Sequence, residues 1–310
     1  MGFEPWLQAA LFGLVGLLIG SFLNVVIHRL PRMMEADWAA ECEEYLRSQP
    51  GAATAAATAT AKSEAEPFNL VTPRSRCPAC GHAVRWHENI PVLSYLWLGG
   101  KCSACKTRIS PRYPAVELAT GLLFWFCARH WGATPTAAAW CAFSAALVTL
   151  ACIDWDTTLL PDDITLPLLW GGLLASAFQW TSVPLFASVA GAAAGYLSLW
   201  TVYWAYKLIR HKEGMGFGDF KLFAALGAWF GWQALVPIIL MSSVIGALIG
   251  VGMKFTRGLR EGGYIPFGPF LAGAGLAAML FGPDRILNTM LSVVESLLGA
   301  LFSAMRALGL

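Results

Sequence analysis

Long apolar runs dominate the chain and alternate with shorter polar segments. The runs without Asp, Glu, Lys or Arg lie at 5–27, 130–153, 164–206, 222–253 and 262–283. A helix crosses a bilayer with about 20 apolar residues, so several of these runs are long enough to span it. The pattern therefore predicts an all-α polytopic membrane protein.

The same pattern predicts about eight transmembrane helices. Their expected bounds are 6–27, 114–131, 136–153, 164–180, 184–207, 220–233, 235–253 and 266–282. The first run lacks the basic start and small-residue end of a cleavable signal peptide, which favours a retained helix. In the tail at 284–310, apolar residues recur at helical spacing, which suits an interfacial helix or a helix packed against the bundle.

Charge is concentrated in one aqueous segment. Only 13% of the 310 residues are charged, against about 25% in globular chains, and 19 of the 40 charged residues lie within 28–113. The net charge of +2 gives no reason to expect nucleic acid as a partner, whereas membrane lipid is expected. The expected division is a first helix (1–27), a cytosolic segment (28–113), a polytopic catalytic membrane domain (114–283) and an amphipathic tail (284–310).

The cytosolic segment has two further features. Residues 34–47 suggest a short amphipathic helix, and the low-complexity tract Gly51–Ala61 suggests a mobile linker. Its orientation follows from the basic residues: the loops on its side of the membrane carry 18 Lys and Arg, against 3 on the other side. The positive-inside rule then places this segment in the cytosol and both termini outside.

Four cysteines carry the first chemical signal. Cys77 and Cys80 form one C-x2-C pair, and Cys102 and Cys105 form a second, 21 residues further on. Two such pairs indicate a metal site, and four thiolates in tetrahedral geometry favour a structural zinc ion because no position is left for water. Disulfides are disfavoured in the reducing cytosol. We expect the zinc domain to cover 73–112, with His82 and His87 as surface residues rather than ligands.

Acidic residues gather at the expected membrane ends. They are Asp154, Asp156, Asp162, Asp163 and Asp219. A carboxylate at a helix start caps the helix and complements its dipole, and this structural role is the main alternative for Asp162 and Asp163. Asp219 differs because it follows Gly216 and Gly218 in a Gly-rich run, which lets backbone approach a partner or substrate closely.

Two more ionisable residues lie near membrane ends. Glu117 falls just inside the second span, where an ionisable group is a functional candidate by default. The alternative is that it reaches the interface or pairs with Arg112. Lys221 follows Asp219 closely and would hold a substrate carboxylate or lower the local field. Its alternative is a position at the membrane edge.

Facing aspartates have a known chemistry. Like charges a few ångströms apart cannot both ionise easily, so one carboxyl of a close pair keeps a proton. The ionised partner takes a proton from water, and the protonated one polarises the scissile carbonyl. Such a pair cleaves peptide bonds.

With these motifs the chain resembles the bacterial prepilin peptidases, or type IV leader peptidases, of the GxGD aspartic protease class. The matching stretches are IGSFLNVVIHRLP (19–31), the cysteine segment 73–117, ACIDWDTTLLPD (151–162), GMGFGDFKLFAALGAWFGW (214–232) and IPFGPFLAGAG (265–275). They follow the family's order over most of the chain. By position, the resemblance assigns catalysis to Asp154 and Asp219 and makes Asp156, Asp162 and Asp163 neighbours that tune or cap.

The resemblance also implies a bifunctional enzyme in the bacterial inner membrane. Such enzymes remove a short basic leader from type IV prepilins or type II secretion pseudopilins, cutting after a glycine at the cytosolic face. They then methylate the new N-terminal residue, usually phenylalanine, from S-adenosylmethionine, and the zinc-bearing members are usually the bifunctional ones. The residues themselves show no donor site. The alternatives are a monofunctional peptidase, a membrane transporter, and a zinc-bearing assembly scaffold.

Overall fold

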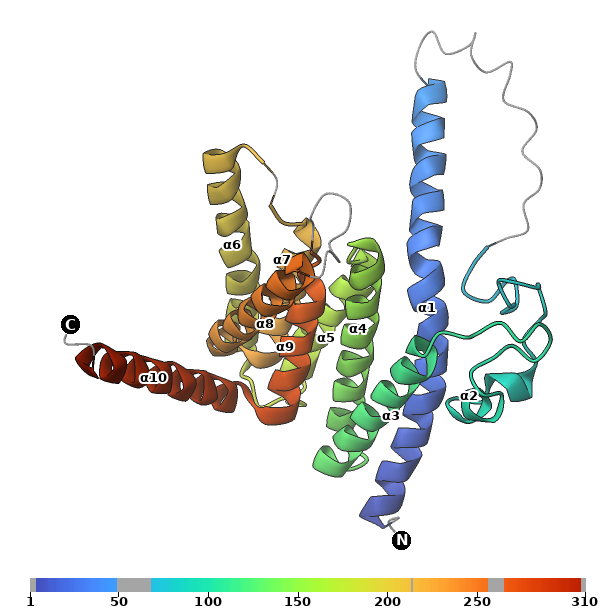
Figure 1. The fold of residues 1–310 in the computed structure, drawn as a ribbon, viewed down its shortest axis with the longest axis horizontal. Coiled ribbons are helices and arrows are strands. Elements are labelled where there is room, and N and C mark those ends of the chain that lie inside the picture. Colours follow the sequence, from blue (N-terminus) through green and yellow to red (C-terminus); the bar gives the residue numbers. More distant parts are fainter. Residues whose placement is uncertain (1–3, 49–67, 213, 256–264, 308–310) are drawn as a thin grey trace. The chain divides into compact units, whose positions relative to one another are not determined.

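The computed structural model describes residues 4–48, 68–212, 214–255 and 265–307 (Figure 1). The linker predicted at 51–61 lies outside them. The chain forms two compact units, Met1–Ala133 and Thr134–Leu310. Helices dominate both units, and the described residues contain isolated bridges but no named strand. The predicted all-α fold is confirmed, whereas the functional boundary expected at 113 and 114 stays a prediction.

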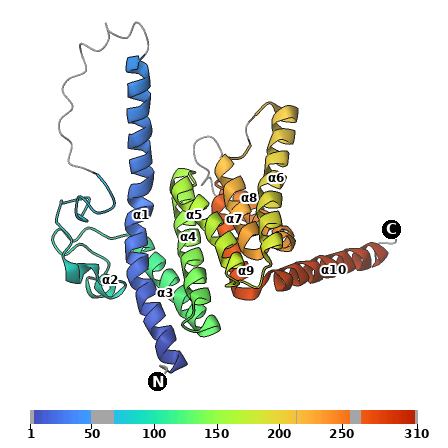
Figure 2. The same cartoon turned by 180° about the vertical axis from the view of Figure 1, so that it is seen from behind.

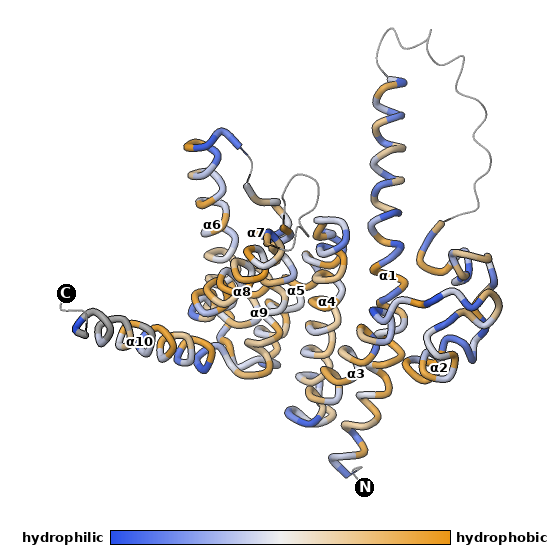
Figure 3. The backbone as a smooth tube through the Cα atoms, viewed as in Figure 1, coloured by the Kyte–Doolittle hydropathy of each residue, from blue (hydrophilic) through white to orange (hydrophobic). Residues whose placement is uncertain are grey.

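The first unit is built on one long helix. It contains α1 (Pro5–Ser48), η3 (Trp86–Asn89), α2 (Leu93–Trp97) and α3 (Arg112–Trp131). Helix α1 continues past the span expected at 6–27 and takes in 34–47, which the sequence suggested as a separate helix. Glu and Ala are frequent there and favour helix. The N-terminal half of α1 is apolar and its C-terminal half is largely hydrophilic (Figure 3).

Glycines bring α1 and α3 into close contact. A Cβ added at Gly20 would lie 2.7 Å from the Cα of Glu117, and one added at Gly16 would lie 2.9 Å from the Cα of Gly121. Gly16 and Gly20 are four residues apart on one face of α1, the spacing by which small residues let membrane helices approach. The packing of α3 on α1 therefore depends on these glycines.

A buried arginine ties the cysteine segment to α1. Arg29 is 7% exposed. Its guanidinium donates hydrogen bonds to the backbone carbonyls of Asn69 at 2.7 Å and Pro73 at 2.6 Å. Because an unpaired buried charge is costly, these two bonds hold the chain that enters the cysteine domain against the helix.

The second unit is a helical bundle. It contains α4 (Pro135–Thr157), α5 (Asp162–Ala177), α6 (Leu185–Arg210), α7 (Phe217–Phe230), η4 (Trp232–Ala234), α8 (Leu235–Phe255), α9 (Gly268–Phe281) and α10 (Pro283–Ala307). Local signals set the ends of α4: the Thr134 side chain accepts a hydrogen bond from the Ala137 amide, and Pro135 occupies the first turn. At the other end, Thr158 adopts a left-handed conformation.

Helix α7 forms the core of the second unit. Every residue from 222 to 229 is buried. On one side, the Trp229 indole donates to the Leu168 carbonyl of α5 at 2.8 Å. On another, the Ser188 hydroxyl of α6 donates to the Ala228 carbonyl at 2.6 Å. These contacts fix α7 on both sides and therefore fix the position of its first turn, where Asp219 lies.

Each of the eight predicted spans corresponds to a helix. Among the described residues, α1, α4, α6 and the segment Trp232–Phe255 are long and apolar enough to cross a membrane, and the bent pair α9 and α10 would make a fifth span. Helices α5, α7 and α9 have 16, 14 and 14 residues, fewer than the usual 20 or so. The protein is a polytopic membrane protein, and the number of eight spans stays a prediction. Helix α10 confirms the helical tail, whereas its interfacial location stays a prediction.

Candidate active site

The two acids singled out by the sequence meet inside the second unit. Asp154 lies near the end of α4 and is 4% exposed, and Asp219 lies in the first turn of α7 and is 7% exposed. Their carboxyl groups are close enough to interact electrostatically. Burial of two acids together is costly unless the pair shares a proton or other partners compensate the charge. The arrangement is the one expected for an aspartate pair, and its catalytic role stays a prediction.

The Gly-rich run shapes the first turn of α7. Gly216 is the N-cap, and its backbone hydrogen-bonds the Asp219 carboxyl, so this acid also satisfies the helix start. A Cβ at Gly218 would lie 2.7 Å from the Cβ of Leu160, whereas one at Gly216 would meet nothing within 4 Å. The close approach predicted for this run therefore falls at Gly218, and the contact is with the loop between α4 and α5.

A third segment closes over Asp154. Gly268 begins α9, and a Cβ added there would lie 2.5 Å from the Oδ2 of Asp154 and 3.2 Å from the Cδ1 of Leu160. This segment was expected to open the span at 266–282 and belongs to the stretches that carry the resemblance, but no role was predicted for Gly268. The pattern Pro266-Phe-Gly-Pro269 contained a usable signal, because glycine has no side chain and lets another group come close to the backbone.

The neighbouring acids occupy other positions. Asp156 and Asp163 are exposed. Asp162, at the start of α5, accepts hydrogen bonds from the Lys221 ammonium at 2.7 and 2.6 Å. This ion pair links the N-terminal parts of α5 and α7. In this structure Lys221 therefore contacts Asp162 and not a substrate carboxylate. The tuning roles predicted for these acids stay predictions.

Glu117 belongs to the first unit. It is 9% exposed on α3, and its Oε2 accepts a hydrogen bond from the Val92 amide at 2.8 Å. Val92 has φ 59°, a left-handed conformation that is unusual for a β-branched residue. Glu117 therefore holds a strained turn at the start of α2. The sequence analysis did not predict this contact with Val92, since its alternatives for Glu117 were a position at the interface and a pair with Arg112.

The four predicted cysteines form one cluster. The Sγ atoms of Cys77, Cys80, Cys102 and Cys105 all lie within 4.8 Å of one another. A zinc ion at about 2.3 Å from four tetrahedral sulfurs sets them about 3.8 Å apart, and the Cys77 and Cys105 sulfurs are 3.8 Å apart. The cysteines therefore could hold a metal ion, and their spacing fits zinc.

The cluster is built from two similar turns. In the first, the Cys77 amide donates to the His82 carbonyl, and Gly81 has φ 71°. In the second, the Cys102 amide donates to the Thr107 carbonyl, and Lys106 has φ 59°. Each turn directs two thiols to one point, as the spacing predicted. Hydrogen bonding with the Thr107 hydroxyl and backbone lowers the pKa of Cys105 to about 6, which favours its thiolate form. At Cys80 the His82 backbone acts in the same direction, but the hydrogen bond with the Cys105 sulfur and burial raise the pKa to about 11.

His82 braces the cluster from outside. Its Nε2 lies 3.2 Å from the Oε2 of Glu88 and 3.3 Å from the Ser103 hydroxyl, which belongs to the second turn. Glu88 also accepts from the Arg85 amide, and this backbone N–H is the main reason why its pKa falls to about 2. His82 is thus outside the ligand cluster, as predicted, but it joins the two turns rather than lying alone on the surface.

Comparisons with known proteins agree with this geometry. One family model, the Bacterial Peptidase A24 N-terminal domain, matches residues 14–131, and a second, the Type IV leader peptidase family, matches residues 141–251. A relative in Pseudomonas aeruginosa is 52% identical over 90% of this chain and 91% of its own length. Relatives in Aeromonas salmonicida and Burkholderia pseudomallei are 50% and 47% identical, over 94% and 89% of this chain and 96% and 86% of theirs.

All three relatives carry the name prepilin leader peptidase/N-methyltransferase. No solved structure gives a significant match. The matched regions include both cysteine pairs, Asp154 and Asp219. The chain therefore belongs to the type IV leader peptidase family.

Proposed function

We propose that this protein is an integral-membrane aspartic endopeptidase that removes the basic leader of type IV prepilins and pseudopilins, cutting after a glycine. The observation that carries the proposal is the burial of Asp154 and Asp219 together, at the end of α4 and the start of α7. The family membership and the names of the relatives support the same activity. They do not favour a transporter or an assembly scaffold.

The proposed reaction uses both carboxyl groups. Two acids this close retain one proton between them, so one is ionised and the other is protonated. The ionised group takes a proton from a water molecule, which attacks the peptide carbonyl next to the glycine. The protonated group donates a hydrogen bond to the carbonyl oxygen and stabilises the negative charge that develops there. The Gly216 backbone and the ion pair of Lys221 with Asp162 hold the first turn of α7 in place.

The location of the site suits a basic leader. In this proposal the end of α4 and the start of α7 face the cytosol at the bacterial inner membrane, and the bias of Lys and Arg toward one set of loops supports that orientation. A leader that remains in the cytosol would reach both carboxyl groups from there. The apolar stretch of the pilin would remain in the lipid beside the bundle.

The cysteine cluster has a structural role in this proposal. Cys77, Cys80, Cys102 and Cys105 would hold one zinc ion, which supplies a cross-link between the two turns. Four thiolates leave no ligand position for water or substrate, so the ion takes no part in peptide hydrolysis.

The second proposed activity is methylation of the new N-terminus, with S-adenosylmethionine as donor. The double names of the relatives support it over a monofunctional peptidase. No donor-binding residues are assigned. Methyl transfer requires positioning of an amine and a donor rather than a carboxyl pair, so an Asp154→Asn enzyme should still methylate a pilin that has already been cut.

Mass spectrometry of the pilin N-terminus tests both activities. Purified enzyme is incubated with a prepilin, with and without S-adenosylmethionine. We expect removal of the leader in both samples and addition of a methyl group only with the donor. A matched prepilin in which the glycine before the cut is replaced by valine should stay intact. An uncut wild-type prepilin would refute the peptidase, and a cut but unmethylated product would favour the monofunctional alternative.

A further inference from the structure

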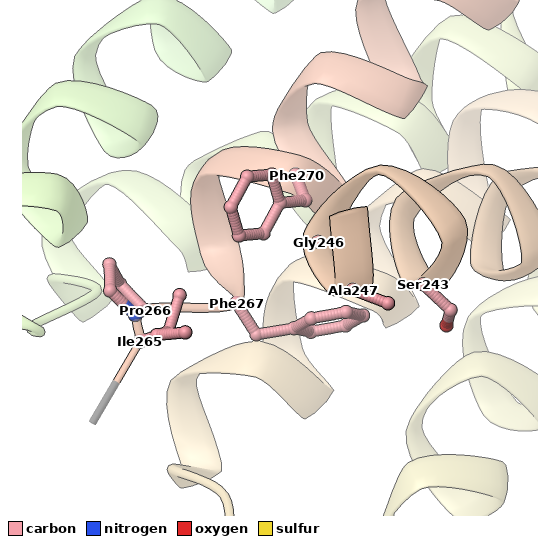
Figure 4. Close-up of a pocket in the computed structure, with 7 residues that line it drawn as sticks. All are labelled: Ser243, Gly246, Ala247, Ile265, Pro266, Phe267 and Phe270. Atoms are coloured by element: carbon pink, nitrogen blue, oxygen red, sulfur yellow. The ribbon is translucent and has the colours of Figure 1, made fainter. Parts of the chain in front are cut away.

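Helix α2 of the cysteine domain (68–112) exposes an apolar face. Leu93, Leu96 and Trp97 are 65%, 68% and 82% exposed, and their spacing of three and four residues places them on one side of the helix. Exposed apolar side chains are ordinary on a helix long enough to span a membrane, such as α8, where Gly246 and Ala247 line an open groove (Figure 4). Helix α2 has only five residues and cannot span, so its exposed face needs another explanation.

A hydrogen bond fixes the level of this face along α1. The Val92 amide, directly before α2, donates to the Glu117 carboxylate at 2.8 Å. Glu117 in turn lies against α1, since a Cβ added at Gly20 would be 2.7 Å from the Glu117 Cα. Helix α2 therefore starts near the level of Gly20, and Figures 1 and 2 both show it beside the N-terminal half of α1.

This level lies inside the apolar part of α1. The run without charged residues ends at residue 27, seven residues after Gly20. At 1.5 Å of rise per residue, Gly20 is about 10 Å inside the apolar length of the helix. The hydrocarbon layer of a bilayer is about 30 Å thick. An α1 that spans this layer with its apolar run therefore holds the start of α2 within one leaflet.

The contacts around α2 suit a position in lipid. Backbone polar groups at that depth need protein partners, and Glu117 supplies one to Val92 just before the helix begins. An ionisable group at membrane depth faces the protein and pairs there, as the buried Glu117 does. At the other end, Gly99 and Gly100 have φ 61° and 67° and reverse the chain, and the Gly100 carbonyl accepts from the Ile109 amide at 2.8 Å. The segment thus enters and leaves on the same side.

Basic side chains accompany the apolar face. Residues 68–112 contain seven Lys and Arg and one acidic residue, Glu88. Lys101 and Arg108 face each other in a bridge directly after the turn that ends α2, and both are exposed. An apolar face with basic residues beside it is typical of segments that bind anionic membrane surfaces. The same positive charge would repel a basic peptide, which disfavours the proposed leader as the occupant of this face.

We propose that α2 inserts its apolar face into the lipid leaflet on the side of the cysteine domain, with Leu93, Leu96 and Trp97 among the acyl chains. The neighbouring basic residues then lie at the headgroups of anionic lipids. Transfer of each leucine from water to hydrocarbon favours insertion by about tenfold or more, so the two leucines together favour it by about 100-fold or more. The inference goes beyond the proposed function and makes the cysteine domain a second membrane anchor, in addition to the spans.

Photocrosslinking tests the insertion. A phenylalanine that carries a benzophenone group replaces Leu96 or, in a separate protein, Leu93, so that the test does not depend on one variant folding. Each full-length protein is reconstituted into nanodiscs of phosphatidylethanolamine and phosphatidylglycerol and irradiated, and lipid adducts are measured by mass spectrometry. We expect at least about tenfold more lipid adduct at either position than at a control position in water, given the preference of the leucines for hydrocarbon.

Val71 is the matched control position. It is an apolar residue of the same domain and is 82% exposed. Its amide donates to the Asn69 side chain, and the Asn69 carbonyl binds Arg29, which lies beyond the apolar run of α1. Lipid adducts at 93 and 96 no more abundant than at 71 would overturn the proposal. Crosslinks from 93 and 96 to protein, in the same chain or a second copy, would show a protein contact instead and also overturn it. The measurement needs no peptidase activity, so failure of the proposed function would not affect its result.

Discussion

Replacing Gly268 by alanine should displace the Asp154 carboxyl. The added Cβ would lie 2.5 Å from Oδ2 and 3.0 Å from Cγ, whereas ordinary van der Waals contact begins near 3.4 Å. The carboxyl or the start of α9 must therefore move by about 0.9 Å, the difference between 3.4 and 2.5 Å. Because a misplacement of about 1 Å in a catalytic group costs about 100-fold in rate, we expect Gly268→Ala to lower kcat by about two orders of magnitude.

The measurement is the rate of leader removal by purified enzyme in detergent, with saturating prepilin. Gly273→Ala is the matched control, because Gly273 lies on the same helix and an added Cβ there meets nothing within 4 Å. Alanine favours helix over glycine by about 1 kcal/mol, so the control should keep its activity and unfold at the wild-type temperature or above. If Gly268→Ala retained more than about half of the wild-type kcat, the contact between α9 and Asp154 would not constrain the reaction.

Further substitutions test the Gly-rich turn and the metal cluster. Gly218→Ala should lower the cleavage rate by about tenfold or more because the new Cβ would press on Leu160, whereas Gly216→Ala, which meets open space, should lose much less. Equal losses in the two variants would contradict this assignment. Purified wild-type protein should hold about one zinc ion by metal analysis, and replacing Cys77 and Cys80 together by serine should remove it and expose residues 73–112 to proteolysis. Full zinc content in that double variant would rule the cluster out as the metal site.

The sequence predicted the helices well because long uncharged runs have few stable alternatives in a membrane. It missed the length of α1, which continues beyond the apolar run into a polar stretch of strong helix formers. The sequence pattern also distinguished poorly between helices long enough to cross the membrane and short helices that are buried in the bundle. The 14 residues of α7 are apolar because they pack inside the second unit, and hydropathy alone does not distinguish that burial from lipid contact.

Within the site, local spacing was enough to predict the cysteine cluster, because each C-x2-C pair is four residues long and forms one turn. Two whole helices, α5 and α6, separate the aspartates in the chain, so predicting that they meet required the resemblance as well as the residues. Contacts such as Lys221 with Asp162, 59 residues apart, had no local signal. The same holds for the hydrogen bond from the Val92 amide to the Glu117 carboxylate, because a partner distant in the chain depends on tertiary packing that has no local sequence signal.

The most direct test of the account is leader cleavage by Asp154→Asn and Asp219→Asn enzymes, measured by mass spectrometry of the pilin N-terminus. An amide can neither accept the proton from water nor share a proton with a carboxyl partner. Asp284→Asn is the control, because Asp284 is an exposed acid in the first turn of α10 and has no proposed part in cleavage, so this variant should cut at close to the wild-type rate. Methylation of a pilin that has already been cut shows that each variant is folded. The account predicts less than about 1% of wild-type cleavage in both aspartate variants, with methylation retained in Asp154→Asn. Cleavage above a few per cent in either variant would contradict the shared-proton pair and move that role to another acid.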